Sequence, residues 1–173
     1  MKELQHYDKA AYNFYAKQKF KDLPILGWDI FSRYFQKICG DFNDVTTLQQ
    51  ISKQRSWEKS FAFNEEILQK EHIIVVTDTN LRIVHATKNI YDMNGYRPEE
   101  IKGLQPKIFQ GPKTCAETAS KIAIAVQNHQ LFEAVILNYR KDGSHYNCWI
   151  KGGPVRNTTG EVVNFIAFER EVA

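Results

Sequence analysis

The stretch that decides the fold is residues 138–157, NYRKDGSHYNCWIKGGPVRN, in the last third of the chain. It is typical of a strand, a tight turn and a second strand. Asp142-Gly143 favours a two-residue hairpin turn, because Gly adopts positive φ without steric cost. The flanking residues 132–139 and 146–150 are rich in aromatic and β-branched side chains, which suit a pleated, half-buried surface. We therefore predict a β-hairpin here.

The segments around this hairpin extend it to a sheet. A turn at residues 157–160 and a β-branched run at 162–168 predict a third strand, and hence a three-stranded antiparallel meander. Upstream, two apolar runs at 73–78 and 81–86 predict a second hairpin. Between this second hairpin and the meander we expect short helices at 89–94 and 98–101, a loop at 103–111 and a longer helix at 115–128. This order predicts an α+β fold, a mostly antiparallel sheet with its helices over one face.

Residues 1–70 are predicted to form an all-helical N-terminal extension, with the sheet domain at 71–173. Apolar residues recur at helical spacing in three stripes, and a helix is expected to end at Gly40 as its C-cap. The stripes fit either a core packed against the sheet or a dimerisation or partner-docking surface. Mixed charges disfavour a DNA-reading helix-turn-helix. The three stripes are Tyr7, Ala11, Phe14 and Tyr15; Trp28, Phe31, Phe35 and Ile38; and Val45, Leu48 and Ile51.

Composition excludes several classes of function. The net charge is +3, with no long Lys/Arg run, which argues against nucleic acid as the main partner. No stretch reaches the roughly 18 apolar residues of a membrane span, and the N-terminus lacks an apolar signal core, so we expect a cytoplasmic protein. Three cysteines without paired spacing argue against disulfides and zinc. No catalytic motif is found, and no enzymatic activity is expected.

Taken together, these segments resemble a PAS domain, most closely the LOV branch of flavin-binding blue-light sensors. The resemblance covers about residues 71–170. It implies the PAS fold, a five-stranded antiparallel sheet with short helices over one face. The matching motifs are IVHAT at 83–87, NGYRPEEIKG at 94–103, FQGP at 109–112, NYRKDG at 138–143 and PVRN at 154–157.

The LOV loop that carries the photoadduct cysteine corresponds here to residues 103–111. Pro106 stands where the cysteine would be, and proline has no nucleophile. The resemblance implies cofactor-binding roles for Gln105, near the flavin side chain, for Lys107, in place of an arginine that faces the phosphate, and for Gln110, which matches. A second phosphate-facing arginine would fall on Ala123, so a dianionic phosphate is less well neutralised.

Three more residues correspond to groups that contact the flavin ring. Asn138 matches the first of two asparagines, Cys148 takes the place of the second, and Glu169 replaces a glutamine of the last strand. Each has a simpler interpretation. Asn138 suits a cap before the turn, and Cys148 suits a small buried apolar position. Glu169 suits a solvated strand edge, or a cavity wall where desolvation would raise its pKa.

The resemblance and the absence of an output domain favour a stand-alone PAS sensory or signal-transduction module. It would bind a small ligand in the PAS cavity, a protein partner or a second copy, or both. One alternative is a flavin-binding light or redox sensor without a cysteinyl adduct. Another is a ligand-free interaction or dimerisation module whose cavity is filled by its own side chains, namely Ile108, Phe109, Phe165 and Phe168.

Overall fold

The computed structural model describes residues 26–173. The chain divides into two compact units, Met1–Lys37 and Ile38–Ala173. Helix α2 (Leu26–Gln54) supplies the described residues of the first unit and opens the second. The first stripe predicted from the sequence, residues 7–15, lies outside the described residues.

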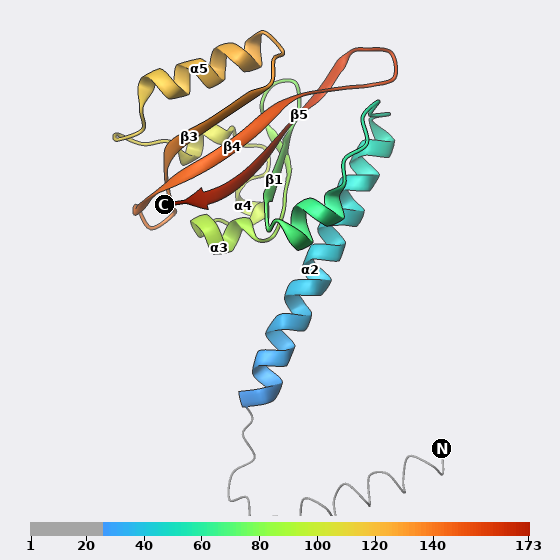
Figure 1. The fold of residues 1–173 in the computed structure, drawn as a ribbon, viewed down its shortest axis with the longest axis vertical. Helices are drawn as coiled ribbons and strands as arrows, with labels where there is room; N and C mark the ends of the chain where they lie inside the picture. Colours follow the sequence, from blue (N-terminus) through green and yellow to red (C-terminus); the bar gives the residue numbers. More distant parts are fainter. Residues whose placement is uncertain (1–25) are drawn as a thin grey trace, which may run out of the picture. The chain divides into compact units, whose positions relative to one another are not determined.

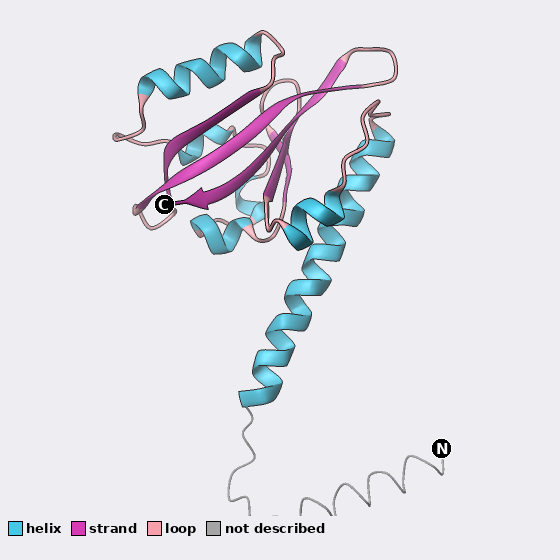
Figure 2. Cartoon of the chain, viewed as in Figure 1, coloured by secondary structure: helices cyan, strands magenta, loops and turns pink. Residues whose placement is uncertain are grey.

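A five-stranded antiparallel sheet forms the centre of the second unit (Figure 1, Figure 2). The spatial order is β2-β1-β5-β4-β3, which confirms the predicted PAS fold. The predicted β3–β4 hairpin is present, but its turn is a three-residue loop at 141–143 and not the predicted two-residue turn. Gly143 N–H donates to Arg140 O at 3.0 Å, Arg140 N–H donates to Ser144 O at 2.8 Å, and Gly143 takes a φ of 86°, which favours glycine. The strands are β1 (Ile73–Thr77), β2 (Ile83–Ala86), β3 (Phe132–Tyr139), β4 (His145–Arg156) and β5 (Val162–Val172).

The inner face of the sheet carries the helices that follow β2. These are α3 (Ile90–Asn94), α4 (Pro98–Ile101), the 3₁₀ helix η2 (Pro106–Phe109) inside the predicted loop, and α5 (Ala116–Gln127). The buried side chains of α3, α4 and η2 form one core cluster with the inner residues of β1, β2, β3 and β4. Its members are Ile73, Val75, Ile83, Ala86, Ile90, Met93, Ile101, Phe109, Ile136, Tyr146 and Cys148.

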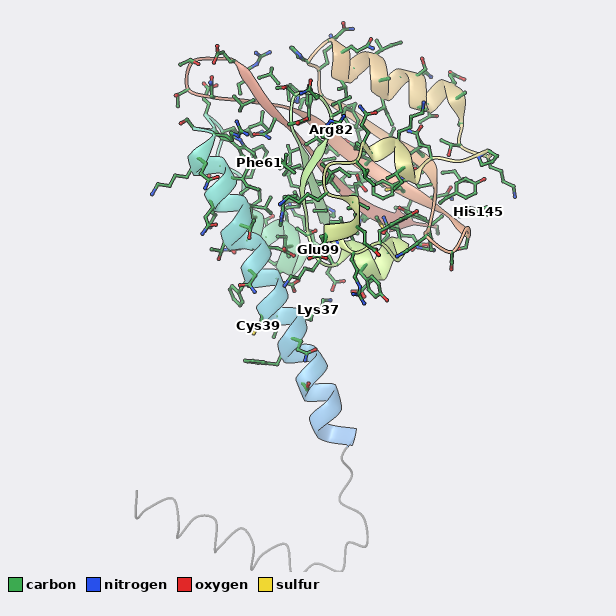
Figure 3. All side chains as sticks on the ribbon, turned by 180° about the vertical axis from the view of Figure 1, so that it is seen from behind. Lys37, Cys39, Phe61, Arg82, Glu99 and His145 are labelled. Atoms are coloured by element: carbon green, nitrogen blue, oxygen red, sulfur yellow. The ribbon has the colours of Figure 1, made fainter. Side chains whose placement is uncertain are left out.

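The outer face is covered by the C-terminal half of α2 and by η1 (Glu65–Gln69), one turn of π-helix. Side chains alternate along β1, so Ile73 and Val75 face inward while Ile74 and Val76 face outward. β1 is therefore buried on both faces. The outer core comprises Val45, Leu48, Trp57, Phe63, Ile67, Ile74, Val76, Val155 and Ile166. Phe61, labelled in Figure 3, stacks on Phe63 and lies 6.0 Å from Phe168 between ring centroids.

The predicted helix end at Gly40 is wrong, because α2 continues through it to Gln54. Glycine inside a helix costs only about 1 kcal/mol relative to alanine, which the packing of the following turns offsets. Gly40 is buried, and a Cβ there would meet Lys88 Cδ at 3.3 Å. Val45 and Leu48 of the third stripe are core residues. The compact unit that holds the sheet thus begins at Ile38, whereas the domain boundary at residue 70 stays a prediction.

None of the helices in residues 26–173 combines the length and the apolar character that a membrane span requires.

Candidate functional site

A cavity of about 410 Å³ lies between the inner face of the sheet and helix α5. α5 packs against β3, yet no residue of this helix is fully buried. The side chains Ala119 and Ala123 are too small to fill the space below the helix, so the cavity stays open. It is lined by Val75, Thr77, Leu81, Gln105, Pro106, Lys107, Gln110, Ala119, Ser120, Ile122, Ala123, Val126, Phe132, Ile150, Phe165, Ile166, Ala167 and Glu169.

Four of the six predicted site residues lie at this cavity. Gln105, Lys107 and Gln110 are exposed side chains at its rim, on or beside η2. Gln105 Nε2 also donates to the backbone oxygen of Asn80 at 3.3 Å, which fixes the rim to the β1–β2 turn. Glu169 lies on the floor, on β5. Their contact with a cofactor stays a prediction.

Glu169 is buried, at 3% exposure, so the solvated-edge interpretation is wrong. Its register position explains this, since it pairs with Ile73 and Ile150 in the middle of the sheet. Removal from water raises the pKa of this carboxyl group to about 7. The alternative interpretation, a carboxyl group in the cavity wall with a raised pKa, is the one that the structure supports.

Cys148 lies next to Glu169 but does not line the cavity. Its Sγ is 3.8 Å from Glu169 Oε2 and 3.6 Å from the carbonyl oxygen of Trp149. Burial, reinforced by the neighbouring Glu169 charge, raises the pKa of the thiol. Cys148 is fully buried, so it behaves as the small core residue that one interpretation expected, and as a weak donor to the carboxyl group.

Asn138 is also outside the cavity lining. It is 6% exposed and pairs with Tyr146 across the β3–β4 ladder. Tyr146 Oη and Asn94 Nδ2 are buried without a hydrogen-bond partner among the described residues. Burial, followed by the charges of Cys148 and Glu169, raises the pKa of the Tyr146 phenol. A polar cluster of Asn94, Asn138, Tyr146 and Cys148 therefore lies beside the cavity rather than in its wall.

Thr77 is a residue of the cavity wall that sequence reasoning missed. It is 5% exposed, and its Oγ1 is buried without a hydrogen-bond partner among the described residues. The sequence indicated this position, because Thr77 follows Ile73 and Val75 at the two-residue spacing of the inward face of β1. A threonine at the third inward position of a core strand places a hydroxyl group in the core.

The residues present fit a LOV-type flavin site only in part. The volume and apolar walls suit a ring, and pockets for small molecules commonly measure about 300–1,000 Å³. The polar groups that would contact the flavin ring do not match, because Asn138 and Cys148 lie outside the cavity lining and a carboxyl group, Glu169, replaces an amide. Pro106 lines the cavity at the position of the adduct cysteine, and Ala123 offers no charge.

The structure also argues against a cavity filled by its own aromatic side chains. Phe109 packs into the core, 5.8 Å from Tyr96 between ring centroids. Phe168 lies against Phe61 and belongs to the outer face. Only Phe165 of the four expected side chains lines the space, which therefore remains open.

No group of three His, Cys, Asp or Glu side chains within residues 26–173 is placed to hold a metal ion.

Comparison with known proteins gives a consistent family assignment. Residues 71–173 match the PAS domain family. The chain is 36% identical over 91 residues to Phototropin-2 of Oryza sativa subsp. japonica, covering 53% of this chain and 10% of that protein. It is 33% identical over 129 residues to Protein TWIN LOV 1 of Arabidopsis thaliana, covering 72% of this chain and 32% of that protein. The chain thus spans a third or less of the length of these two relatives.

Solved structures agree in fold. A light-oxygen-voltage domain studied with a flavin analogue superposes with a TM-score of 0.61 at 25% identity, covering 66% of this chain and 87% of that chain. The dark structure of the blue-light photoreceptor Aureochrome1 LOV superposes with a TM-score of 0.60 at 24% identity, covering 67% of this chain and 86% of that chain. With its five-stranded sheet, its inner helices and the match over residues 71–173, the chain belongs to the PAS domain family.

Proposed function

We propose that this chain is a PAS sensory module that binds a small molecule in the cavity between α5 and the sheet, and that it acts by binding rather than by catalysis. The observation that carries this is the open cavity of about 410 Å³ with mostly apolar walls. Its two unusual wall groups, Thr77 and Glu169, are buried and lack strong partners among the described residues. Buried polar groups are normally paired, so a ligand would complete this site.

Ligand binding would affect the outer layer through β1 and β5, because both strands contribute side chains to the cavity and to the outer core. β5 contributes Ala167 and Glu169 to the cavity floor and Ile166 to the outer core. β1 contributes Val75 and Thr77 inward, and Ile74 and Val76 outward against the layer of α2 and η1. A ligand that favours one packing of these two strands would shift the equilibrium of the outer layer as well.

The test is to extract and identify small molecules that copurify with the full chain, by native mass spectrometry followed by denaturation. Ala167→Leu would place a larger side chain in the middle of the floor, and we expect it to abolish the bound mass. Ala116→Leu makes the same change at an exposed position of α5 and should leave the bound mass unchanged. Equal occupancy in both variants would contradict the proposal.

A flavin is the second candidate ligand, favoured by the matching Gln110 at the rim and by the similarity to proteins named for LOV domains. Binding would be without a cysteinyl adduct, because Pro106 carries no thiol. Absorption spectra of the chain with added riboflavin, FMN and FAD test this. Shifted vibronic bands would support it, and unchanged spectra of the free flavins would exclude it.

A protein partner or a second copy is a further candidate, carried by an apolar patch on the outer side of β3 and β4. Leu131 is 80% exposed and Val135 53%, and Trp149 lies opposite Val135. We expect Val135→Lys to weaken self-association or partner capture while the fold is kept, as measured by light scattering and by cross-linking. The exposed Lys121→Glu on α5 serves as the control for a change of charge.

A further inference from the structure

Two polar groups of the cavity wall lack the partners that buried groups usually have. Thr77 Oγ1 has no hydrogen-bond partner among residues 26–173. The Glu169 carboxyl group forms no ion pair with any described residue, and its one side-chain hydrogen bond is the 3.8 Å contact with the thiol of Cys148, a weak donor. Unsatisfied buried groups in a native fold call for an explanation, and a ligand in the cavity supplies one.

These two groups lie at opposite ends of the cavity floor. Thr77 pairs with Phe165, and Ile73, four residues earlier on β1, pairs with Glu169. At about 3.3 Å per residue, the two positions are separated by roughly 13 Å along the strands. Val75 and Ala167 form the apolar floor between them. The wall therefore suits an elongated ligand with an apolar body and a polar group at each end.

The charge distribution distinguishes the two ends. Glu169 is the one acidic side chain of the lining, and it is nine-tenths buried or more. Lys107 is the one basic side chain, and it is exposed at the rim. A buried carboxylate is stable only with a paired opposite charge, and without one it keeps its proton more strongly. The pKa of Glu169, raised by burial to about 7, reflects this missing partner.

We propose that the cavity selects an organic cation, a ligand with an apolar, ring-sized body and a protonated amine that binds the Glu169 carboxylate. The ammonium group would supply the missing charge and donate a charge-assisted hydrogen bond, which is stronger than a neutral one. The Thr77 hydroxyl would bind a polar group at the other end of the body. This proposal rests on the proposed ligand-binding function of the cavity.

The test compares two probes with the same ring by isothermal titration calorimetry at pH 8, tryptamine as the cation and its neutral alcohol analogue tryptophol. At this pH a primary amine is protonated, and Glu169 is largely ionised. We expect tryptamine to bind roughly tenfold more tightly than tryptophol, the ratio expected of one charge-assisted contact. Glu169→Gln should remove this preference.

Glu171→Gln is the matched control, because Glu171 lies on the same strand but outside the cavity, paired with Arg140. It should keep the preference for the cation. Equal binding of the two probes, or tighter binding of tryptophol, would overturn the cation proposal and leave the ligand-binding function standing. A preference that survives in Glu169→Gln would also overturn it. Binding of neither probe would overturn the cation proposal, whereas the ligand-binding function is tested separately by the bound mass in Ala167→Leu and Ala116→Leu.

Discussion

The two layers that cover the sheet differ in how completely they fill the space over its central strands, β1 and β5. On the outer face, Leu48 of α2 and Ile74 of β1 are completely buried. Trp57 Nε1 donates to Asn164 Oδ1 at 3.0 Å, and Asn164 Nδ2 donates to the Thr77 backbone oxygen at 2.9 Å. On the inner face, α5 has no fully buried residue and leaves a cavity.

The difference lies in side-chain volume and in polar pairing. The outer layer places large side chains over β1 and β5 and satisfies its buried amides. On the inner face, α5 packs against β3, and its small side chains Ala119 and Ala123 line the cavity over β1 and β5. The hydroxyl group of Thr77 has no hydrogen-bond partner among the described residues. Because interiors are normally close-packed and paired, the packing of the outer layer favours stability, whereas the open cavity of the inner face agrees with the ligand-binding function that we propose. The predictions below test this contrast.

The largest effect is expected from truncation in the outer layer. Leu48→Ala removes a side chain with no exposed surface and should lower the free energy of unfolding by about 3 kcal/mol. Ile122→Ala, at the cavity wall, should cost only about 1 kcal/mol, because the side chain is half-buried and already borders empty space. Urea denaturation of both variants measures the difference. Similar losses would mean that the two layers are packed alike.

The second effect is a pH-dependent gain in the free energy of unfolding of the variant Glu169→Gln relative to the parent protein. The pKa of Glu169 rises from 4.5 to about 7 on folding, so its contribution to stability is fully present below pH 4.5 and is lost as pH rises through 7. Glutamine does not ionise. The variant should therefore gain stability relative to the parent protein as pH rises, approaching about 3 kcal/mol above pH 7.

Urea denaturation between pH 5 and pH 8 measures this gain, with Glu171→Gln as a control that should show little change. A difference that stays constant across this pH range would show that Glu169 is ionised in the folded protein throughout.

The smallest effect distinguishes two buried threonines. Thr87 Oγ1 accepts from the Ile74 N–H at 3.0 Å and donates to Asn89 Oδ1 at 2.6 Å. Thr87→Val leaves that N–H unpaired and should cost about 2 kcal/mol. Thr77→Val removes a hydroxyl group that has no partner among the described residues, and should change stability by less than about 0.5 kcal/mol or raise it slightly. Thermal unfolding compares them, and a large loss for Thr77→Val would reveal a hydrogen bond in the free protein.

Local patterns in the sequence were enough to predict the sheet, because its turns and strands are signalled by neighbouring residues. Asp142-Gly143 marks the β3–β4 turn, and alternation marks the strands. Gly40 misled the prediction, since whether glycine ends a helix depends on the packing of the turns that follow. The resemblance predicted Gln105, Lys107, Gln110 and Glu169 as site residues, and all four line one cavity.

Other features of the site could not be predicted from local patterns. Asn138 and Cys148 share the inner face of the sheet with the cavity residues but lie beside the cavity, and that depends on where α5 packs. The missing partner of Thr77 likewise depends on contacts between β1, β5 and α5 rather than on its neighbours in sequence. Packing between distant segments therefore determined which of the predicted residues line the site.

The most direct test of the contrast between the layers is methyl NMR of the full chain under xenon pressure, after refolding to remove bound small molecules. Xenon enters apolar cavities that stay dry and shifts the methyl signals around them. We expect shifts at Ile122 and Val126, in the cavity wall, and none at Val45 and Leu48, in the outer core. Shifts confined to the outer core, or none at the cavity wall, would contradict it.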